Sequence, residues 1–403
     1  MVAGADFGFG AYSRLLREPG AVALGFWGMV GRFPIAMRPI SCLLLISAVT
    51  GSLGDAGAVA AAMLVAQGIA SPALGRLADR VSQRRVLLTA CAAHAAAITS
   101  LLVAILLGAP LWLLVVAAAA TGCASVSFTS FMRARWTRMV EHGLLRTAFA
   151  LESVLDETIF LLGPLLVTAL AATAHPAAGL VACAVLTTAG SVVVALHRRS
   201  EPVPAPTTER PPRAIGVPGV RVLMVAYAGM GFQLGAVDVA LVAFAREWSM
   251  PALGGVFLSL TAVGSLVAGV VFGAVDAKLP PRRLLSVTTW VLALGAVPLA
   301  FAGSPLTMGL FAALAGLAIA PALITGSTLL ESLAPRGSLS EGFSWLTSAG
   351  AVGIAAGTAV GGRLADGGFA GSAWVAVGGG ALALVLSLGG QAALRPRQET
   401  TAQ

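Results

Sequence analysis

Long apolar runs, separated by short polar stretches that hold most of the charged residues, recur along the whole chain. Each run has about 20 residues or more, the length that an α-helix needs to cross the hydrocarbon core of a bilayer. Twelve runs meet this condition, at residues 20–49, 56–77, 86–108, 110–132, 148–172, 177–197, 220–244, 252–275, 284–303, 305–330, 343–363 and 371–394. The pattern therefore predicts twelve crossings of a membrane.

Helices fit these runs better than the strands of a barrel. A segment in lipid must satisfy its own backbone hydrogen bonds, which leaves only helices and closed barrels. The runs are about twice as long as a barrel strand, and they do not alternate apolar with polar residues. We therefore predict an all-α integral membrane protein with twelve transmembrane helices.

Composition excludes the water-soluble classes. Only 10% of the 403 residues are charged, against about 25% in soluble domains, and the mean hydropathy is +0.91. The net charge of +8 is spread between the apolar runs and is not gathered in one basic patch. We therefore expect a lipid bilayer around the chain and no nucleic-acid partner.

The positive residues follow an alternating pattern that predicts orientation. All but four of the 25 lysines and arginines fall in the two tails and in every second loop. The remaining loops hold only Arg246 and Arg363, while Arg32 and Arg38 lie within the first apolar run. Because positive loops stay on the cytoplasmic side, we expect a multi-pass protein of the inner (plasma) membrane with both termini in the cytoplasm.

A proline-rich polar stretch from Glu201 to Arg213 divides the runs into two sets of six and is expected to be an extended linker. An internal repeat supports this division. In each half, the loop after the second run has an acid soon after a glycine and two arginines at the next helix start. The expected segments are a cytoplasmic tail (1–19), an N-terminal six-helix bundle (20–197), a cytoplasmic linker (198–219), a C-terminal six-helix bundle (220–394) and a second cytoplasmic tail (395–403).

The first of these loops reads Gly75-Arg-Leu-Ala-Asp79-Arg80-Val-Ser-Gln-Arg84-Arg85. It resembles the signature loop of the major facilitator superfamily, G-x-L-A-D-R-x-G-R-R, and departs from it at Ser82, where the family has glycine. The resemblance implies two pseudo-symmetric six-helix bundles. It also implies a gating loop of Gly75, Asp79, Arg80 and Arg84 that latches the bundles on the cytoplasmic side. The alternative interpretation is that these arginines act only as topology signals.

The fifth run contains Gly163-Pro164, which is similar to the centre of the antiporter motif G-x-x-x-G-P-x-x-G-G. The flanking positions are Ile159, Val167 and Thr168 in place of glycines. This half-match favours efflux. Independently of any motif, a Gly-Pro pair can kink or thin a helix where it packs.

Three carboxylates, Glu152, Asp156 and Glu157, lie in the inner half of the fifth run. Ionisable groups at this depth face a cavity or a partner. Arg32 lies about 18 Å along the first helix and Asp156 about 13 Å along the fifth. Because the resemblance places these helices side by side, a pair between Arg32 and Asp156 or Glu157 is expected. The cluster is either the proton-coupling site or a structural salt-bridge network.

Other polar side chains within the runs are candidates for a substrate cavity, together with Arg32. Arg38 could meet an anionic substrate, or its side chain could extend to the outer headgroups. Gln233 and Asp238 lie on the seventh helix, which the resemblance places along the cavity, and Trp345 of the eleventh could form part of an apolar wall.

We expect no cofactor, no metal site and no catalytic residue. The four histidines and four cysteines are dispersed, and His94 is expected to be a buried histidine with its hydrogen bonds satisfied. The chain has no G-x-x-x-x-G-K-[ST] loop for ATP. A membrane enzyme is therefore disfavoured, and a non-transporting ligand sensor is a remote alternative.

Two transport functions remain. The leading hypothesis is proton-coupled export of a small amphipathic organic molecule by a monomer that uses alternating access. The alternative is uptake or facilitated diffusion of a polar or anionic solute bound by Arg32 or Arg38. The two differ in whether these arginines are free or already paired with carboxylates.

Overall fold

The structure is a computed structural model that describes residues 10–50, 53–203, 213–250, 252–274, 279–335, 337–365 and 368–394. The expected tails at 1–9 and 395–403, and the middle of the expected linker at 204–212, lie outside this part. Across the described residues all regular elements are helices. These helices form twelve spans that are long and apolar enough to cross a membrane. The prediction of twelve transmembrane helices is confirmed.

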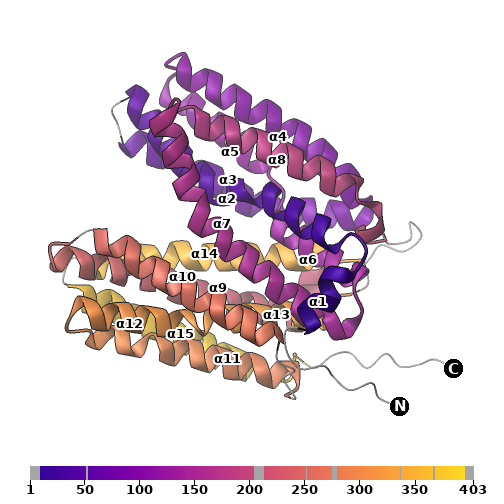
Figure 1. Ribbon diagram of the computed structural model, residues 1–403, viewed down its shortest axis with the longest axis vertical. Helices are drawn as coiled ribbons and strands as arrows, with labels where there is room; N and C mark the ends of the chain where they lie inside the picture. Colours follow the sequence, from indigo (N-terminus) through magenta and orange to yellow (C-terminus); the bar gives the residue numbers. More distant parts are fainter. Residues whose placement is uncertain are drawn as a thin grey trace. The chain divides into compact units, whose positions relative to one another are not determined.

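The first half of the chain carries six of these spans, the fourth of which is made of two helices (Figure 1). Its α-helices are α1 (Gly10–Arg17), α2 (Ala21–Thr50), α3 (Leu53–Arg80), α4 (Gln83–Leu106), α5 (Leu111–Cys123), α6 (Phe128–Met139), α7 (Leu145–Thr173) and α8 (Ala178–Leu196). Two 3-10 turns, η1 (His142–Leu144) and η2 (Arg198–Ser200), precede α7 and follow α8.

The second half begins with a 3-10 turn, η3 (Ala214–Gly216), and repeats the pattern. Its helices are α9 (Pro218–Glu247), α10 (Ala252–Ala274), α11 (Pro281–Gly295), the 3-10 helix η4 (Val297–Phe301), α12 (Pro305–Gly316), α13 (Ile319–Leu333), α14 (Leu339–Ala365) and α15 (Phe369–Gly389). The fourth span is interrupted in both halves, between α5 and α6 and again between α12 and α13. This shared interruption agrees with the internal repeat.

The chain forms two compact units. The N-terminal unit comprises Leu16–Val140 and the described residues from 155 to 203, and the C-terminal unit comprises residues 10–15, Glu141–Val154 and the described residues from 213 to 394. The first part of α7 therefore belongs with the C-terminal helices, although the sequence assigned all of 20–197 to one bundle. Specific contacts hold it there, because Thr147 Oγ1 donates to the carbonyl of Gly273 at 2.9 Å and Phe149 meets the edge of Phe343.

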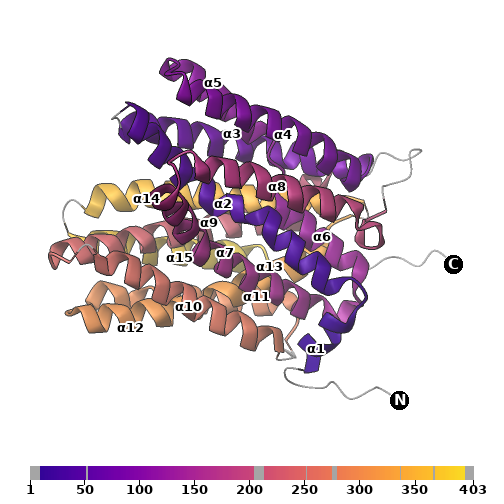
Figure 2. The ribbon, with the colours of Figure 1, turned by 45° about the horizontal axis from the view of Figure 1, so that its top comes forward.

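Each unit has its own apolar core. In the N-terminal unit, α3, α4 and α5 run alongside one another (Figure 2), and Met37, Leu45 and Ile98 lie buried among them and their neighbours. In the C-terminal unit, Phe244 and Met308 belong to the corresponding core. Large apolar side chains also cover the outer surface. Such a surface requires hydrocarbon as its solvent.

Residues 10–15, the first part of α1, pack within the C-terminal unit. Tyr12 Oη donates to the carbonyl of Val270 at 3.1 Å, and burial raises the pKa of the Tyr12 phenol to about 12. The hydroxyl therefore keeps its proton and remains a donor at neutral pH. This contact ties the beginning of the described chain to the C-terminal end of α10.

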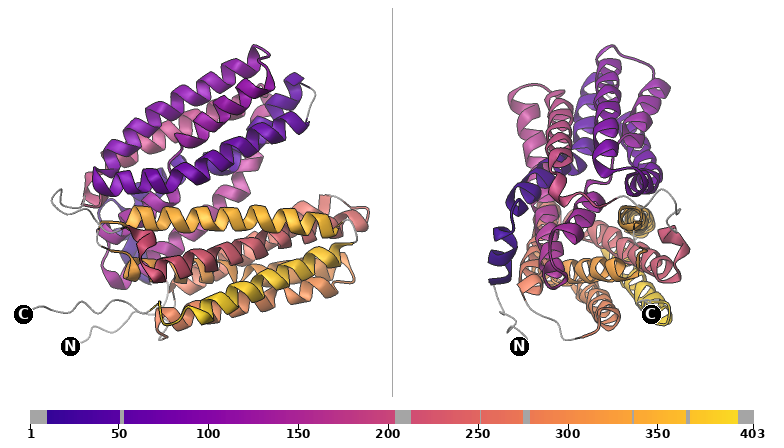
Figure 3. Two further views of the ribbon diagram at one scale, coloured as in Figure 1. Left: turned by 180° about the vertical axis from the view of Figure 1, so that it is seen from behind. Right: turned by 90° about the vertical axis from the view of Figure 1, so that its right-hand side faces the viewer.

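Helices α9 and α14 lie side by side (Figure 3), and glycines let their backbones approach closely. At Gly357 of α14, an added Cβ would meet the backbone carbonyl of Phe232 in α9. The absence of a side chain lets the two backbones touch, which is the usual means of close helix packing in lipid.

Gly357→Ala is therefore expected to lower the free energy of unfolding by about 1–3 kcal/mol, measured as a reduced Tm in detergent. Gly362→Ala is the matched control, because a Cβ at that position of the same helix meets nothing within 4 Å. Equal Tm values for the two variants would contradict the proposed packing.

Candidate functional site

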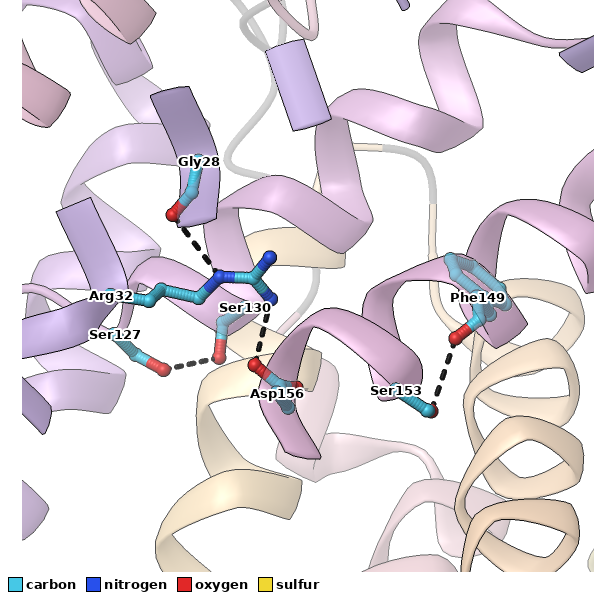
Figure 4. A network of polar contacts seen from close by, with 7 residues as sticks. All are labelled: Gly28, Arg32, Ser127, Ser130, Phe149, Ser153 and Asp156. Atoms are coloured by element: carbon cyan, nitrogen blue, oxygen red, sulfur yellow. Dashed lines mark hydrogen bonds and ion pairs between the residues drawn. The ribbon is translucent and has the colours of Figure 1, made fainter. Parts of the chain in front are cut away.

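An ion pair lies in the membrane-spanning part of the N-terminal unit, where α2 supplies Arg32 and α7 supplies Asp156. Arg32 Nη1 is 2.8 Å from Asp156 Oδ1 (Figure 4). The Arg32 side chain is 0% exposed and that of Asp156 is 25% exposed. An ion pair between Arg32 and Asp156, one of the two expected from the sequence, is therefore present.

The helix backbone orients the arginine. Arg32 Nε donates to the carbonyl of Gly28, one turn earlier in α2, at 3.1 Å. Ser127 and Ser130, which hydrogen-bond to each other at 2.6 Å, lie nearby at the start of α6 (Figure 4). Removing one member of a buried ion pair costs about 3–5 kcal/mol, so a change of charge at Asp156 has consequences for the packing of both helices.

The three carboxylates of the fifth span are divided between the two units. Glu152 is fully buried and belongs to the segment that packs in the C-terminal unit. Asp156 and Glu157 follow the unit boundary after Val154, and Glu157 is partly exposed. Asp156 has an arginine partner and is 25% exposed, so its carboxylate is partly accessible to its surroundings.

Gly163 of the half antiporter motif lies where α7 approaches α2. A Cβ there would be 2.9 Å from Cβ of Ala36, so the glycine permits a close crossing next to the Arg32–Asp156 pair. Helix α7 continues past Pro164 to Thr173. The Gly-Pro pair thus thins this helix without ending it.

The predicted gating loop joins α3 to α4. Gly75 and Asp79 are buried and Arg80 is exposed on α3, while Arg84 lies in the first turn of α4. Ser82, the departure from the family pattern, caps α4 by accepting a hydrogen bond from the backbone N–H of Arg85. A glycine could not provide this cap.

Glu201, which was not among the residues predicted for this loop, closes the turn. Its Oε1 accepts from Ser82 Oγ at 2.6 Å and from the backbone N–H of Arg84 at 2.9 Å. The carboxylate therefore neutralises the positive start of α4 and attaches the end of the sixth span to the gating loop.

Arg135 of α6 supports the same region from inside the unit. It is fully buried and donates to Gln83 Oε1 at 2.9 Å and to Ser200 Oγ at 2.9 Å. Burial and the neighbouring Arg135 guanidinium lower the pKa of His197, so His197 is neutral at neutral pH.

Arg38 lies inside the N-terminal unit and does not extend to the outer headgroups. It is 6% exposed, and Nε donates to the carbonyl of Pro34 at 3.1 Å. Its Nη1 donates to Ser125 Oγ at 2.5 Å and its Nη2 to Gln67 Oε1 at 3.1 Å. The partners come from α2 itself, from α3 and from the break between α5 and α6.

The remaining candidates belong to the C-terminal unit. Gln233 is 2% exposed, and its Nε2 donates to the carbonyl of Leu292 in α11 at 2.6 Å, so it connects two helices. Asp238 is exposed on α9, and Trp345 is partly exposed on α14. Within the described ranges, no three His, Cys, Asp or Glu side chains are close enough to hold a metal ion.

Comparison with known proteins identifies the class. The sequence model of the Major Facilitator Superfamily matches residues 22–219. A bacterial homologue of the iron transporter ferroportin shares the fold with a TM-score of 0.74 and 16% identity, over 91% of this chain and 98% of that one. The human organic anion transporter MFSD10 does so with a TM-score of 0.72 and 14% identity, over 92% and 99%.

The Escherichia coli fucose:proton symporter FucP is also similar, with a TM-score of 0.68 and 12% identity over 94% of this chain and 99% of that one. No curated protein sequence matches this one. The fold and the family match define a multi-pass membrane transporter that works by alternating access, and not an enzyme. The chain belongs to the major facilitator superfamily.

Glu201→Ala is expected to destabilise the protein by about 1–2 kcal/mol, because both the helix cap and the gating turn lose a charged acceptor. Thermal unfolding in detergent measures this. Glu201→Gln, which keeps one carbonyl oxygen, should recover part of the loss. A Tm unchanged in Glu201→Ala would contradict the role given to this carboxylate.

Proposed function

We propose that this protein exports a small amphipathic organic molecule in exchange for protons, with Asp156 as the proton carrier. The observation that carries the proposal is the 2.8 Å contact between a fully buried Arg32 and a partly exposed Asp156. The proposal further places the protein in the cell membrane as a monomer with both termini in the cytoplasm.

Proton binding at this pair changes the energy of the unit. In the present arrangement the guanidinium donates a charge-assisted hydrogen bond to the carboxylate. A proton on Asp156 would take away the counter-charge that lies 2.8 Å from the buried Arg32, which costs several kcal/mol. A proton on Asp156 therefore favours an arrangement in which water or a further group takes the place of this carboxylate beside Arg32. Such a difference between two states is what couples a proton to alternating access.

The position of Asp156 along α7 supports this coupling. The unit boundary lies between Val154 and Leu155, immediately before the carboxylate. Residues on the two sides of the boundary have their contacts in different units. A change in the charge of Asp156 therefore acts close to the place where the packing of α7 changes.

Export of an amphipathic molecule is supported by two features. Gly163-Pro164 matches the centre of the antiporter motif, and Gly163 allows α7 to cross α2 closely. Arg32 already has a carboxylate partner, so an anionic substrate would have to displace Asp156 from it. An uncharged amphipathic substrate would not.

The alternative, uptake of an anionic solute, is favoured by Arg38 alone. The hydrogen-bond partners found for this arginine in the described chain are neutral: Pro34, Gln67 and Ser125. The human organic anion transporter MFSD10 has the same fold, which is consistent with anion transport on this scaffold. Counterflow of organic anions in proteoliposomes, reduced in Arg38→Gln, would favour this alternative.

Asp156→Asn is expected to reduce transport driven by a pH gradient at least tenfold and to leave substrate counterflow without a gradient intact. The assay uses proteoliposomes with a trapped pH-sensitive dye and a panel of uncharged and cationic amphipathic dyes as substrates. The double variant Arg32→Gln/Asp156→Asn removes both charges of the pair, so no buried arginine loses its counter-charge. It tests whether pH-driven transport is lost without that source of instability.

Glu157→Gln is the matched comparison, because it neutralises the adjacent carboxylate. It should retain pH-driven transport. Loss of pH-driven transport in Glu157→Gln but not in Asp156→Asn would assign the proton to Glu157. Unchanged pH-driven transport in both variants would contradict proton transport through this cluster.

A further inference from the structure

Two buried arginines lie on α2, and they differ in how their charge is balanced. Arg32 has Asp156 at 2.8 Å. Arg38, six residues later, donates to a backbone carbonyl, a hydroxyl and an amide oxygen. Neutral acceptors satisfy its N–H groups but leave its charge uncompensated in a part of the chain that crosses the membrane, and a buried cation of this kind attracts an anion.

A small pocket adjoins Arg38 within the N-terminal unit. Four helices and the α5–α6 break surround it, and its volume is about 20 Å³. Its polar lining consists of Arg38, His94, Ser125, Thr187 and Ser191. A volume of this size holds about one water-sized group, which excludes an organic substrate.

The break in the fourth span contributes to this pocket. Helix α5 ends at Cys123 and α6 begins at Phe128, and residues of the break line the pocket together with Phe128. The N-terminal end of α6 carries a partial positive charge. Ser127, the residue before α6, makes no side-chain hydrogen bond to cap this end.

His94 of α4 also lines the pocket, and its two ring nitrogens differ in their partners. The residue is 1% exposed, and its Nδ1 is 3.2 Å from the carbonyl of Thr121. Because a carbonyl only accepts, Nδ1 carries the hydrogen in this geometry. Its Nε2, in contrast, is buried and has no hydrogen-bond partner, and the side chain lines the pocket.

The protonation of His94 decides what the pocket can hold. A neutral ring with its hydrogen on Nδ1 presents a lone pair from Nε2, which repels an anion. A protonated ring carries a positive charge and has an N–H in place of that lone pair. An anion that enters together with a proton therefore finds two donors and leaves the net charge of the site unchanged.

We propose that this pocket binds one small monovalent anion of halide size, between Arg38 and His94, together with one proton on His94. The groups that face His94 are Arg38 from α2, the thiol of Cys91 from its own helix, the Thr121 carbonyl and Ser125 hydroxyl from the fourth span, and the Thr187 and Ser191 hydroxyls from α8. The thiols of Cys42 and Cys183 lie close to Arg38. The proposal does not rest on the proton role of Asp156.

Chloride is the probe, and thermal unfolding of the full chain in detergent is the measurement. Sodium chloride is titrated against sodium gluconate at constant ionic strength, between about pH 5.5 and about pH 8, where a histidine titrates. Chloride should raise the Tm saturably. The chloride concentration that gives half of the Tm increase should rise by up to about tenfold per pH unit in the upper part of this pH range, because one proton binds with each anion.

Three variants separate the contributions. Arg38→Gln should abolish the chloride effect. His94→Gln, whose amide donates without titrating, should keep a chloride effect that no longer depends on pH. Arg32→Gln is the matched control, because it removes a buried arginine of the same helix that does not line the pocket, and it should keep the chloride effect and its pH dependence.

The outcomes distinguish the possible occupants. Superimposable chloride and gluconate curves at every pH would mean that the pocket holds water only and would overturn the proposal. A chloride effect with the same midpoint at all pH values in the unmodified protein would overturn it as well. Sodium formate tests the size limit, because a response to formate without one to chloride would assign the site to a carboxylate group and contradict a halide-sized ligand.

Discussion

Charges that must lie in hydrocarbon impose the main constraint on this molecule. Lipid offers no hydration, so each buried ionic group needs a counter-charge or a full set of hydrogen bonds. Helix α2 contains both solutions, with Arg32 paired to Asp156 and Arg38 surrounded by neutral acceptors. The first arrangement can be disrupted by a proton, and the second has an uncompensated charge. Both properties are useful to a transporter that changes state when it binds ions.

The same constraint explains the supporting structure. The buried guanidinium of Arg135 donates to Gln83, to Ser200 and to the carbonyl of His197, which are all neutral acceptors. Glu201 neutralises the start of α4 at the gating loop. These contacts connect the start of the third span with the ends of the fourth and sixth spans in the N-terminal unit. The loop that carries the family signature is thus tied to the helices that follow it, in addition to any role in gating.

The sequence was sufficient for the fold because the relevant signals are local. A run of about 20 apolar residues has one stable form in lipid, and a single loop, Gly75 to Arg85, carried the family resemblance. An ion pair of Arg32 with Asp156 or Glu157 was also expected, because the rise per residue gives their depths and the family resemblance implies that the first and fifth helices are neighbours.

The features that the sequence did not predict depend on contacts between residues distant in sequence. The break between α5 and α6 was missed, because the apolar run at 110–132 continues through it and its hydroxyls bond to groups on other helices. Arg38 could not be placed, because Gln67 and Ser125 are far along the chain. Glu201 belongs to a stretch whose prolines predict only a linker. The division of α7 after Val154 follows from side-chain contacts such as Thr147 with Gly273, which no periodicity reveals.

The central claim is that Asp156 is ionised beside Arg32 and takes up the transported proton. Infrared difference spectroscopy of the purified protein during acidification tests it most directly, because a protonated carboxyl group has its own C=O stretching band. The account predicts a band that grows as the pH falls and disappears in Asp156→Asn. A band that is unchanged in Asp156→Asn would contradict it.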